Sequence, residues 1–237
     1  MRNVVVTDVE RPPLGQLDAL VAYGVATVGE AQGRAGYLGS DLRARLPGAR
    51  IAGSVVTAVC WPGDNLMIHA AVEQCAPGDV LVVTATSPCT DGLFGELFAT
   101  SLRAREVRGA VLTTGARDMA ELREMGFPVW SRAVSAQGSV KATAGAVNVP
   151  VSIGGCLVSP GDAVVADDDG VVVVPRLSLP AVLEASQARE AKEAATREAF
   201  TGGQLGLDRY DLRPLLDDLG VRYLTQSDWR HEQEVDR

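Results

Sequence analysis

The chain has 237 residues, enough to bury one sizeable core, with 46% hydrophobic and 22% charged residues as in ordinary globular proteins. Its formal net charge is −8, and no cluster of Lys and Arg stands out, so we expect no nucleic-acid partner. No apolar run approaches the length that spans a bilayer, so we expect no membrane partner.

The cysteines and lysines limit which metal sites and covalent reactions the chain could support. The four cysteines form no CxxC pair, and no Cys/His spacing suits structural zinc. We expect free thiols in a reducing cytoplasm, because the N-terminal residues also lack a signal-peptide pattern. Only two lysines, Lys141 and Lys192, are available for Schiff-base chemistry.

The first elements are predicted from capping and turn signals. A helix is expected over residues 17–36, where Thr27 and Glu30 have the spacing of a capping box. The run IAGSVVTAVC predicts a strand over residues 51–60. After the turn WPGD, a helix is expected from about residue 65 to 75.

The central part alternates between apolar strands and helices, which predicts parallel strands joined by crossover helices. A loop of small and turn-forming residues is expected over 86–94. The other predicted elements are a strand over 79–85, a helix from about 95 to 107, a strand over 110–114, a helix over 117–125 and a strand beginning near 127.

The C-terminal part departs from this alternation. Asp167-Asp168-Asp169-Gly170 lies between two β-rich runs and predicts a hairpin turn rather than a metal site, so the sheet should be mixed. An Ala/Glu-rich helix is expected over 179–200 and a short helix beyond it. The polar residues 227–237 are expected to be frayed.

Two carboxylates and one guanidinium should meet at one edge of this sheet. Glu96 begins the helix after strand 79–85, while Arg117 and Asp118 directly follow strand 110–114. Parallel strands joined by a right-handed crossover place both loops at the same edge, where open α/β sheets bind ligands. Glu96 and Asp118 would suit Mg²⁺, and Arg117 suits a carboxylate or keto oxygen.

Each of these residues also has a structural explanation. Asp118 with Glu121 has capping-box spacing, and Glu96 favours the dipole of its own helix. Arg117 alone would most often form a surface ion pair. His69, on the helix from 65 to 75, would be a satisfied structural histidine.

At these residues the chain resembles the class II pyruvate aldolases that cleave 4-hydroxy-4-methyl-2-oxoglutarate and 4-carboxy-4-hydroxy-2-oxoadipate. These enzymes share a superfamily with the RraA regulators of ribonuclease E activity. The matching stretches include CTDGLFGELFATSLRAR, GARD, FPVWSRAVSAQGSVKAT and PGDAVVADDDGVVVVP, and they span nearly the whole chain. The family signature is an acidic residue, twenty residues, then Arg-Asp, which Glu96 and Arg117-Asp118 match, although the similar aldolases have Asp at the first position.

The resemblance implies a fold and an assembly. The fold is α/β, a mixed-sheet, layered β/β/α domain of the swivelling type with a long C-terminal helix. It implies one domain over 1–237, with a core at about 17–176 and a helical extension at about 177–237. It also implies a homotrimer or homohexamer with active sites between subunits.

The resemblance assigns roles at this site. Asp118 would ligate Mg²⁺ or Mn²⁺, and Glu96 would bind the metal through water. Arg117 would bind the keto acid and stabilise its enolate. The remaining implied residues are the backbone of Gly95, Leu97 and Phe98 for the substrate carboxylate, Asn65 and His69 in the substrate pocket, and Glu30 and Glu193 of the adjacent subunit, which bind the metal through water.

The implied activity is retro-aldol cleavage of a 4-hydroxy-2-oxo acid to pyruvate and a second keto acid, with oxaloacetate decarboxylation as a side activity. Alternatives are a lyase or decarboxylase acting on another keto acid, a Schiff-base aldolase using Lys141, and a non-catalytic RraA-like regulator of ribonuclease activity. A methyltransferase has no support, because no glycine-rich nucleotide loop follows the first strand.

Overall fold

The structure is a computed structural model that describes residues 3–235. The chain divides into two units, Met1–Arg189 and Glu190–Arg237. The boundary between them lies inside helix α5 (Leu179–Thr201).

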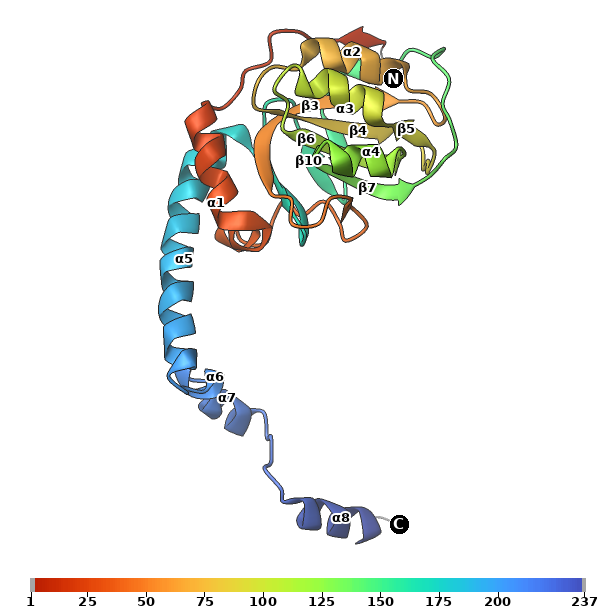
Figure 1. Ribbon diagram of the computed structural model, residues 1–237. Coiled ribbons are helices and arrows are strands. Elements are labelled where there is room, and N and C mark those ends of the chain that lie inside the picture. The colour runs from red at the N-terminus through yellow and green to blue at the C-terminus, as the bar shows by residue number, and fades with distance from the viewer. Residues whose placement is uncertain (1–2, 236–237) are drawn as a thin grey trace. The chain divides into compact units, whose positions relative to one another are not determined.

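The centre of the first unit is a ten-stranded mixed sheet in which four neighbouring strands are parallel. The crossover helices between these strands lie over one face of the sheet (Figure 1). This arrangement confirms the expected parallel strands and crossover helices. The parallel strands are β3 (Ile51–Cys60), β4 (Asp79–Ala85), β6 (Gly109–Ala116) and β7 (Val129–Val134), and the helices are α2 (Leu66–Gln74), α3 (Glu96–Arg103) and α4 (Met119–Glu124).

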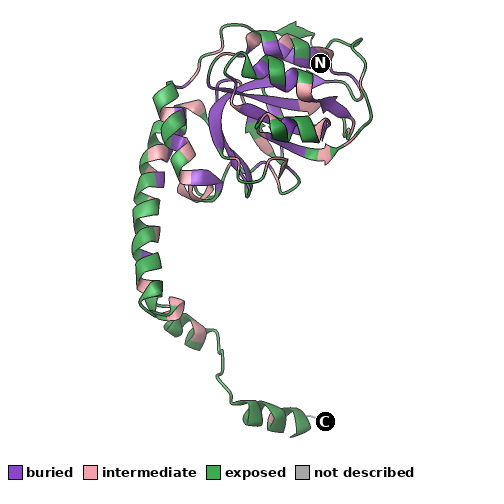
Figure 2. Ribbon diagram, in the orientation of Figure 1, coloured by how far each residue is buried: buried purple, intermediate pink, exposed green. Residues whose placement is uncertain are grey.

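Strand β4 shows why the central strands are continuously apolar. Leu81 and Val83 belong to the core under the crossover helices, whereas Val80 and Val82 belong to a second core on the opposite face. Successive side chains of a strand point to opposite faces, so a strand covered on both faces needs apolar residues throughout. Figure 2 shows these strands as buried.

The other strands of the large sheet include antiparallel pairs, so the sheet is mixed. The hairpin β11 (Ala163–Asp167) and β12 (Gly170–Val174) turns at Asp168–Asp169, as predicted, and β11 pairs antiparallel with β3. The mixed α/β fold predicted from the sequence is confirmed. The remaining strands are β1 (Val4–Val5), β2 (Arg43–Ala44), β5 (Gly92–Phe94) and β8 (Ala146–Val147) in the large sheet, and β9 (Val151–Ile153) and β10 (Cys156–Val158) in a two-stranded sheet.

The predicted capping box at Thr27 and Glu30 is wrong. Helix α1 (Leu14–Ala31) is interrupted at Gly24, whose φ is 74°, so Thr27 lies inside the second helical piece. The backbone N–H of Val25 donates to Asp167 Oδ2 at 2.9 Å. The carboxylate that accepts from the restarted helix therefore comes from the distant β11–β12 turn, which no local pattern reveals.

The second unit contains the end of α5 followed by three short helices: α6 (Gly206–Arg209), α7 (Arg213–Asp218) and α8 (Gln226–Val235). Helix α8 corrects the expectation of frayed residues after 227, and residues 236–237 lie outside the described part. Thr225 Oγ1 accepts from the N–H of Asp228 at 3.2 Å and donates to its carboxylate at 2.6 Å. The Thr225 hydroxyl thus caps the start of the helix.

The lengths of the helices and the state of the cysteines can also be read from the structure. No helix in the described part of the chain is both long and apolar enough to cross a membrane. All four cysteines, Cys60, Cys75, Cys89 and Cys156, are free, as expected. Burial raises the pKa of the Cys60 and Cys75 thiols to about 12.

Candidate active site

Glu96, Arg117 and Asp118 lie at the same edge of the sheet, as the strand order predicts, but the two carboxylates do not meet, because that of Glu96 accepts a hydrogen bond from Thr100 Oγ1. Asp118 Oδ2 accepts a hydrogen bond from the backbone N–H of Glu96 at 3.1 Å and lies 3.6 Å from Arg117 Nε. Strand β5, where the sequence predicted only loop, pairs with the end of β6, and the N–H of Arg117 donates to the carbonyl of Phe94 at 2.9 Å. The three residues are therefore fixed at the carboxyl edge of the sheet.

Asp118 does not act as the helix cap that its spacing to Glu121 suggested. It precedes α4 with φ 57° and ψ 46°, in the left-handed region, and makes no side-chain capping bond to that helix. A non-glycine residue in this region is uncommon, and such conformations concentrate at functional sites. The capping interpretation is wrong, and the Asp118 carboxylate points to α3 instead.

Gly95, the residue before α3, allows this close approach. A Cβ built on Gly95 would overlap Asp118 Oδ2 and lie 3.1 Å from Arg117 Cγ. The φ of Gly95 is −152°, which any residue adopts, so space rather than backbone freedom requires glycine here. The close packing of Asp118 and Arg117 against α3 therefore requires a residue without a Cβ at position 95.

We expect Gly95→Ala to abolish ligand binding at this site while leaving the protein folded, because the new methyl group must displace Asp118 or Arg117. Gly15→Ala is the matched control, since a Cβ at Gly15, on helix α1, has no heavy atom within 4 Å. Pyruvate binding by calorimetry and thermal unfolding of both variants would check this. Unchanged binding in Gly95→Ala would show that the site tolerates the displacement.

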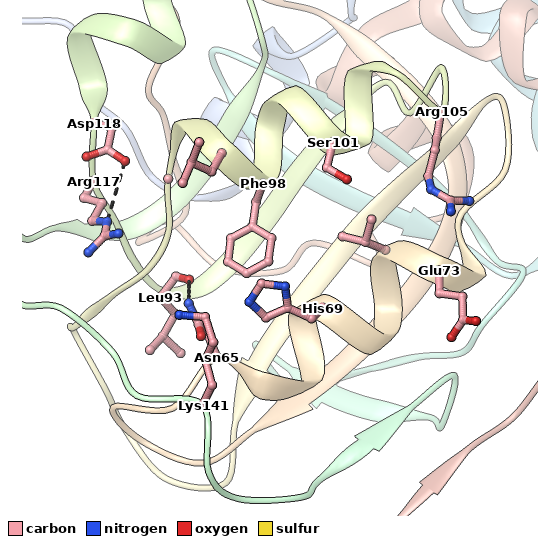
Figure 3. A pocket seen from close by; sticks show the side chains of 13 residues that line it. Asn65, His69, Glu73, Leu93, Phe98, Ser101, Arg105, Arg117, Asp118 and Lys141 are labelled. Carbon is pink, nitrogen blue, oxygen red and sulfur yellow. Dashed lines mark hydrogen bonds and ion pairs between the residues drawn. The ribbon is translucent and has the colours of Figure 1, made fainter.

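The site lies in a cavity of about 440 Å³ between α2, α3 and the segment that contains Lys141 (Figure 3). Seven of the predicted site residues line it: Asn65, His69, Gly95, Leu97, Phe98, Arg117 and Asp118. Glu96 contributes its backbone N–H, while its carboxylate accepts a bond from Thr100 Oγ1 at 2.7 Å.

Asn65 and His69 form one wall of the cavity. Asn65 is 5% exposed and donates through Nδ2 to the carbonyl of Leu93 at 3.1 Å, which leaves its buried Oδ1 without a partner in the described residues. His69 is exposed, and its ring centroid lies 4.6 Å from that of Phe98, so it is no buried structural histidine. Partial burial lowers the pKa of His69, and the charge of Lys141 lowers it further.

The start of α3 offers fewer free donors than the resemblance implied. The N–H of Phe98 is directed at the carbonyl of Gly95 at 3.2 Å, and the N–H of Glu96 is bound to Asp118. The N–H groups of Gly95 and Leu97 make no hydrogen bond within residues 3–235. An anion at this helix start would therefore meet two unengaged donors and the helix dipole.

The other two predicted acidic residues lie elsewhere in the chain. Glu30 lines a separate cavity with Tyr37 and Asp169, and it pairs with Arg34 at 3.0 Å and with Arg189 at 3.6 Å. Glu193 is half-buried on α5, in the second unit.

Sequence reasoning missed part of the cavity wall. Helical spacing was a usable signal, since Glu73 follows His69 by four residues on α2, and Ser101 follows Phe98 by three on α3. For Lys141, the sequence suggests only a Schiff-base role. The lining residues absent from the predicted site are Val72, Glu73, Leu93, Ser101, Arg105 and Lys141.

The residues present fit a divalent cation of the Mg²⁺ type. Mg²⁺ keeps several waters and takes one or two carboxylates rather than a full protein cage. Accordingly, no group of three or more His, Cys, Asp or Glu side chains in the described residues is arranged for a metal. Asp118 Oδ2 accepts from the N–H of Glu96, whereas Oδ1 has no hydrogen-bond partner among the described residues and could bind such an ion.

The fold and this site define the class to which the chain belongs. Residues 17–173 match the RraA-like family, described as Aldolase/RraA, and the chain is a member of it.

Three relatives show the range of this family. The chain is 30% identical over 161 residues to a Halalkalibacterium halodurans protein named "Putative 4-hydroxy-4-methyl-2-oxoglutarate aldolase", covering 68% of this chain and 77% of that one. A Streptomyces coelicolor protein, RraAS2, titled an unusual member of the RNase ES inhibitor RraA family, is 31% identical with TM-score 0.71, over 79% of this chain and 98% of that one. An uncharacterized Pseudomonas syringae pv. tomato protein is 26% identical with TM-score 0.73, over 83% and 96%.

Proposed function

We propose that this chain is a carbon–carbon lyase that cleaves a 4-hydroxy-2-oxo acid to pyruvate and a second keto acid with the help of Mg²⁺ or Mn²⁺. The observation that carries the proposal is the joint placement of Arg117, Asp118 and the start of α3 in one cavity. A guanidinium, a carboxylate and free backbone N–H groups together suit an acid with adjacent carboxylate and keto groups.

Different residues of the site would bind different groups of the substrate. The C1 carboxylate would accept hydrogen bonds from the N–H groups of Gly95 and Leu97. The C2 keto oxygen would face Arg117, whose backbone is held by its bond to Phe94. A divalent ion held by Asp118 would supply Lewis acidity at the keto oxygen.

In the proposed reaction, a water or hydroxide molecule takes the proton of the C4 hydroxyl as the C3–C4 bond breaks. The electron pair of that bond reaches the C2 oxygen and gives the pyruvate enolate, whose negative charge Arg117 stabilises. A water molecule then protonates C3 and pyruvate is released, while C4 leaves as the carbonyl carbon of the second keto acid. The same enolate forms when oxaloacetate loses CO₂, so we expect oxaloacetate decarboxylation as a side activity.

We also propose that the complete site forms between subunits of a trimer or hexamer. Within one chain, Glu30 lines a separate cavity rather than the one that contains Asp118. In the proposed assembly, Glu30 and Glu193 of an adjacent subunit would bind the waters of the ion, together with Glu96.

The first experiment is pyruvate release from 4-carboxy-4-hydroxy-2-oxoadipate, 4-hydroxy-4-methyl-2-oxoglutarate and oxaloacetate, with Mg²⁺ and after EDTA. We expect turnover that EDTA removes and added Mg²⁺ restores. Turnover of oxaloacetate alone would point to a different hydroxy-oxo acid or keto acid as substrate. Turnover that persists in EDTA, together with a borohydride-trapped pyruvate adduct, would favour the Schiff-base alternative.

A non-catalytic regulator of ribonuclease activity is the second candidate, favoured by the 31% identity to the ribonuclease-inhibitor relative from Streptomyces coelicolor. It predicts inhibition of a ribonuclease by the folded protein and no pyruvate release from any of the three acids.

A further inference from the structure

We propose that Thr100 is a positioning residue for the metal site. Its hydroxyl holds the Glu96 carboxylate against α3, so that Glu96 acts on the bound ion only through water. Asp118 then remains the one carboxylate of this chain that binds the ion directly. This inference rests on the proposed function, because it assumes that a divalent ion lies at Asp118.

The hydrogen bond of Thr100 differs from those that two other helical threonines make. Thr196 and Thr201, on α5, donate to the main-chain carbonyl four residues earlier, at 2.9 and 2.8 Å. This bond is common for a threonine inside a helix. Thr100 Oγ1 donates instead to a side chain four residues earlier, and lies 2.7 Å from Glu96 Oε1. The hydroxyl of Thr100 is therefore used to hold Glu96 rather than to bond its own helix backbone.

Glu96 lies close enough to Asp118 for such a restraint to matter. The N–H of Glu96 donates to Asp118 Oδ2 at 3.1 Å, so the Glu96 side chain starts beside the proposed metal ligand. Glutamate is the longer of the two acidic side chains, and Mg²⁺ takes one or two carboxylates. A Glu96 carboxylate without a restraint would therefore be able to replace one water of the ion.

The Glu96 carboxylate does not lie at the place where Asp118 would bind an ion. Asp118 lines two cavities, of about 440 and 380 Å³, and Glu96 lines neither of them. Within residues 3–235, the Glu96 carboxylate has no hydrogen bond or ion pair other than the bond from Thr100. One hydroxyl group thus determines where this carboxylate lies.

Asp64, another carboxylate near the cavity, is held much more firmly. It is 2% exposed, one oxygen accepts from a main-chain N–H at the start of α2, and the other accepts from the N–H groups of Ala142 and Thr143 at 2.9 and 2.7 Å. The main chain of that segment also bonds to residues 63–65. Burial alone would raise the pKa of the Asp64 carboxyl, but these hydrogen bonds outweigh it and the pKa lies below its usual value. Glu96 is only half-buried and has one such bond, so a single substitution releases it.

The position of Glu96 would affect both metal binding and turnover. A second carboxylate bound directly to the ion would strengthen its attachment, because opposite charges at short range attract. The same carboxylate would reduce the positive charge that polarises the keto oxygen of the substrate. Loss of the restraint should therefore give tighter metal binding together with slower turnover.

Titration with Mn²⁺ tests the proposal without turnover. Electron paramagnetic resonance of the full-length protein gives the affinity for Mn²⁺, and water-proton relaxation gives the number of waters on the bound ion. We expect Thr100→Val to tighten Mn²⁺ binding about fivefold, the effect of one exposed ionic contact, and to remove one water from the ion. Thr100→Ser keeps the hydroxyl and should match the wild-type protein in both measurements.

Two comparisons separate positioning from a purely structural role. In the Glu96→Gln background, Thr100→Val should change neither the affinity nor the number of waters, because the charged side chain that it would release is gone. Thr201→Val, at another exposed helical threonine, should leave both measurements unchanged in the otherwise wild-type protein.

The proposal would be overturned by an unchanged number of waters or weaker Mn²⁺ binding in Thr100→Val, or by the same change in the Glu96→Gln background. A Thr100→Ser variant that behaves like Thr100→Val, or a wild-type protein that binds no Mn²⁺, would also overturn it. The proposed lyase function fails separately, if the Mn²⁺ measurements are as expected yet the wild type releases no pyruvate from any of the three acids.

Discussion

Arg117→Ala is expected to lower kcat for pyruvate release about 10²- to 10³-fold, in line with the loss of one preorganised donor to a developing oxyanion. The side chain is 42% exposed and its ion pair with Asp118 spans 3.6 Å, so its removal should leave the fold intact. The loss should be equal for hydroxy-oxo acid cleavage and for oxaloacetate decarboxylation, since the proposed mechanism takes both reactions through the same enolate. Steady-state kinetics with a lactate dehydrogenase couple measure it.

Arg123→Ala is the matched control for this change. Arg123 is an exposed arginine on α4 that does not line the cavity, and its removal should leave both activities within about twofold of wild type. Near-wild-type turnover in Arg117→Ala would remove the guanidinium from the proposed mechanism.

Asp118→Asn is expected to reduce turnover at least about 10²-fold and to abolish the protection against thermal unfolding that we expect Mg²⁺ to give the wild-type protein. The amide oxygen of Asn can still accept from the N–H of Glu96, so the variant removes the charge and keeps the shape. Thermal melts with and without Mg²⁺ therefore report the loss of a ligand rather than a loss of structure.

The Asp118 test has its own control in Glu121→Gln. If Asp118 and Glu121 were a capping pair, both changes would lower the melting temperature and neither would affect Mg²⁺. The left-handed conformation of Asp118 and its bond to α3 instead predict a metal effect at position 118 alone. A Glu121→Gln variant that loses the Mg²⁺ effect would contradict this prediction.

Sequence patterns were sufficient for the parts of the site governed by local and topological rules. The apolar run of β4 and the right-handed crossover bring Glu96 to Asp118, and both follow from chain order. The three-residue strand β5 was missed because its glycine and turn-rich surroundings resemble a loop.

The errors arose where the structure depends on contacts between distant residues. The restart of α1 at Val25 depends on Asp167, and the position of Lys141 depends on Asp64. Neither pair has a sequence spacing that identifies it. The left-handed backbone of Asp118 was not predicted either, because the sequence around it matches an ordinary helix start.

Residues 140–143 are attached to residues 63–65 in a way that affects which positions of the chain can change in sequence. The contacts use main-chain groups of the segment and one carboxylate, Asp64, so the residue type at position 141 has no part in holding the loop. Position 141 can therefore change by single substitutions without reshaping the scaffold. Substitutions at position 141 are therefore expected to alter the wall of the cavity without altering the fold.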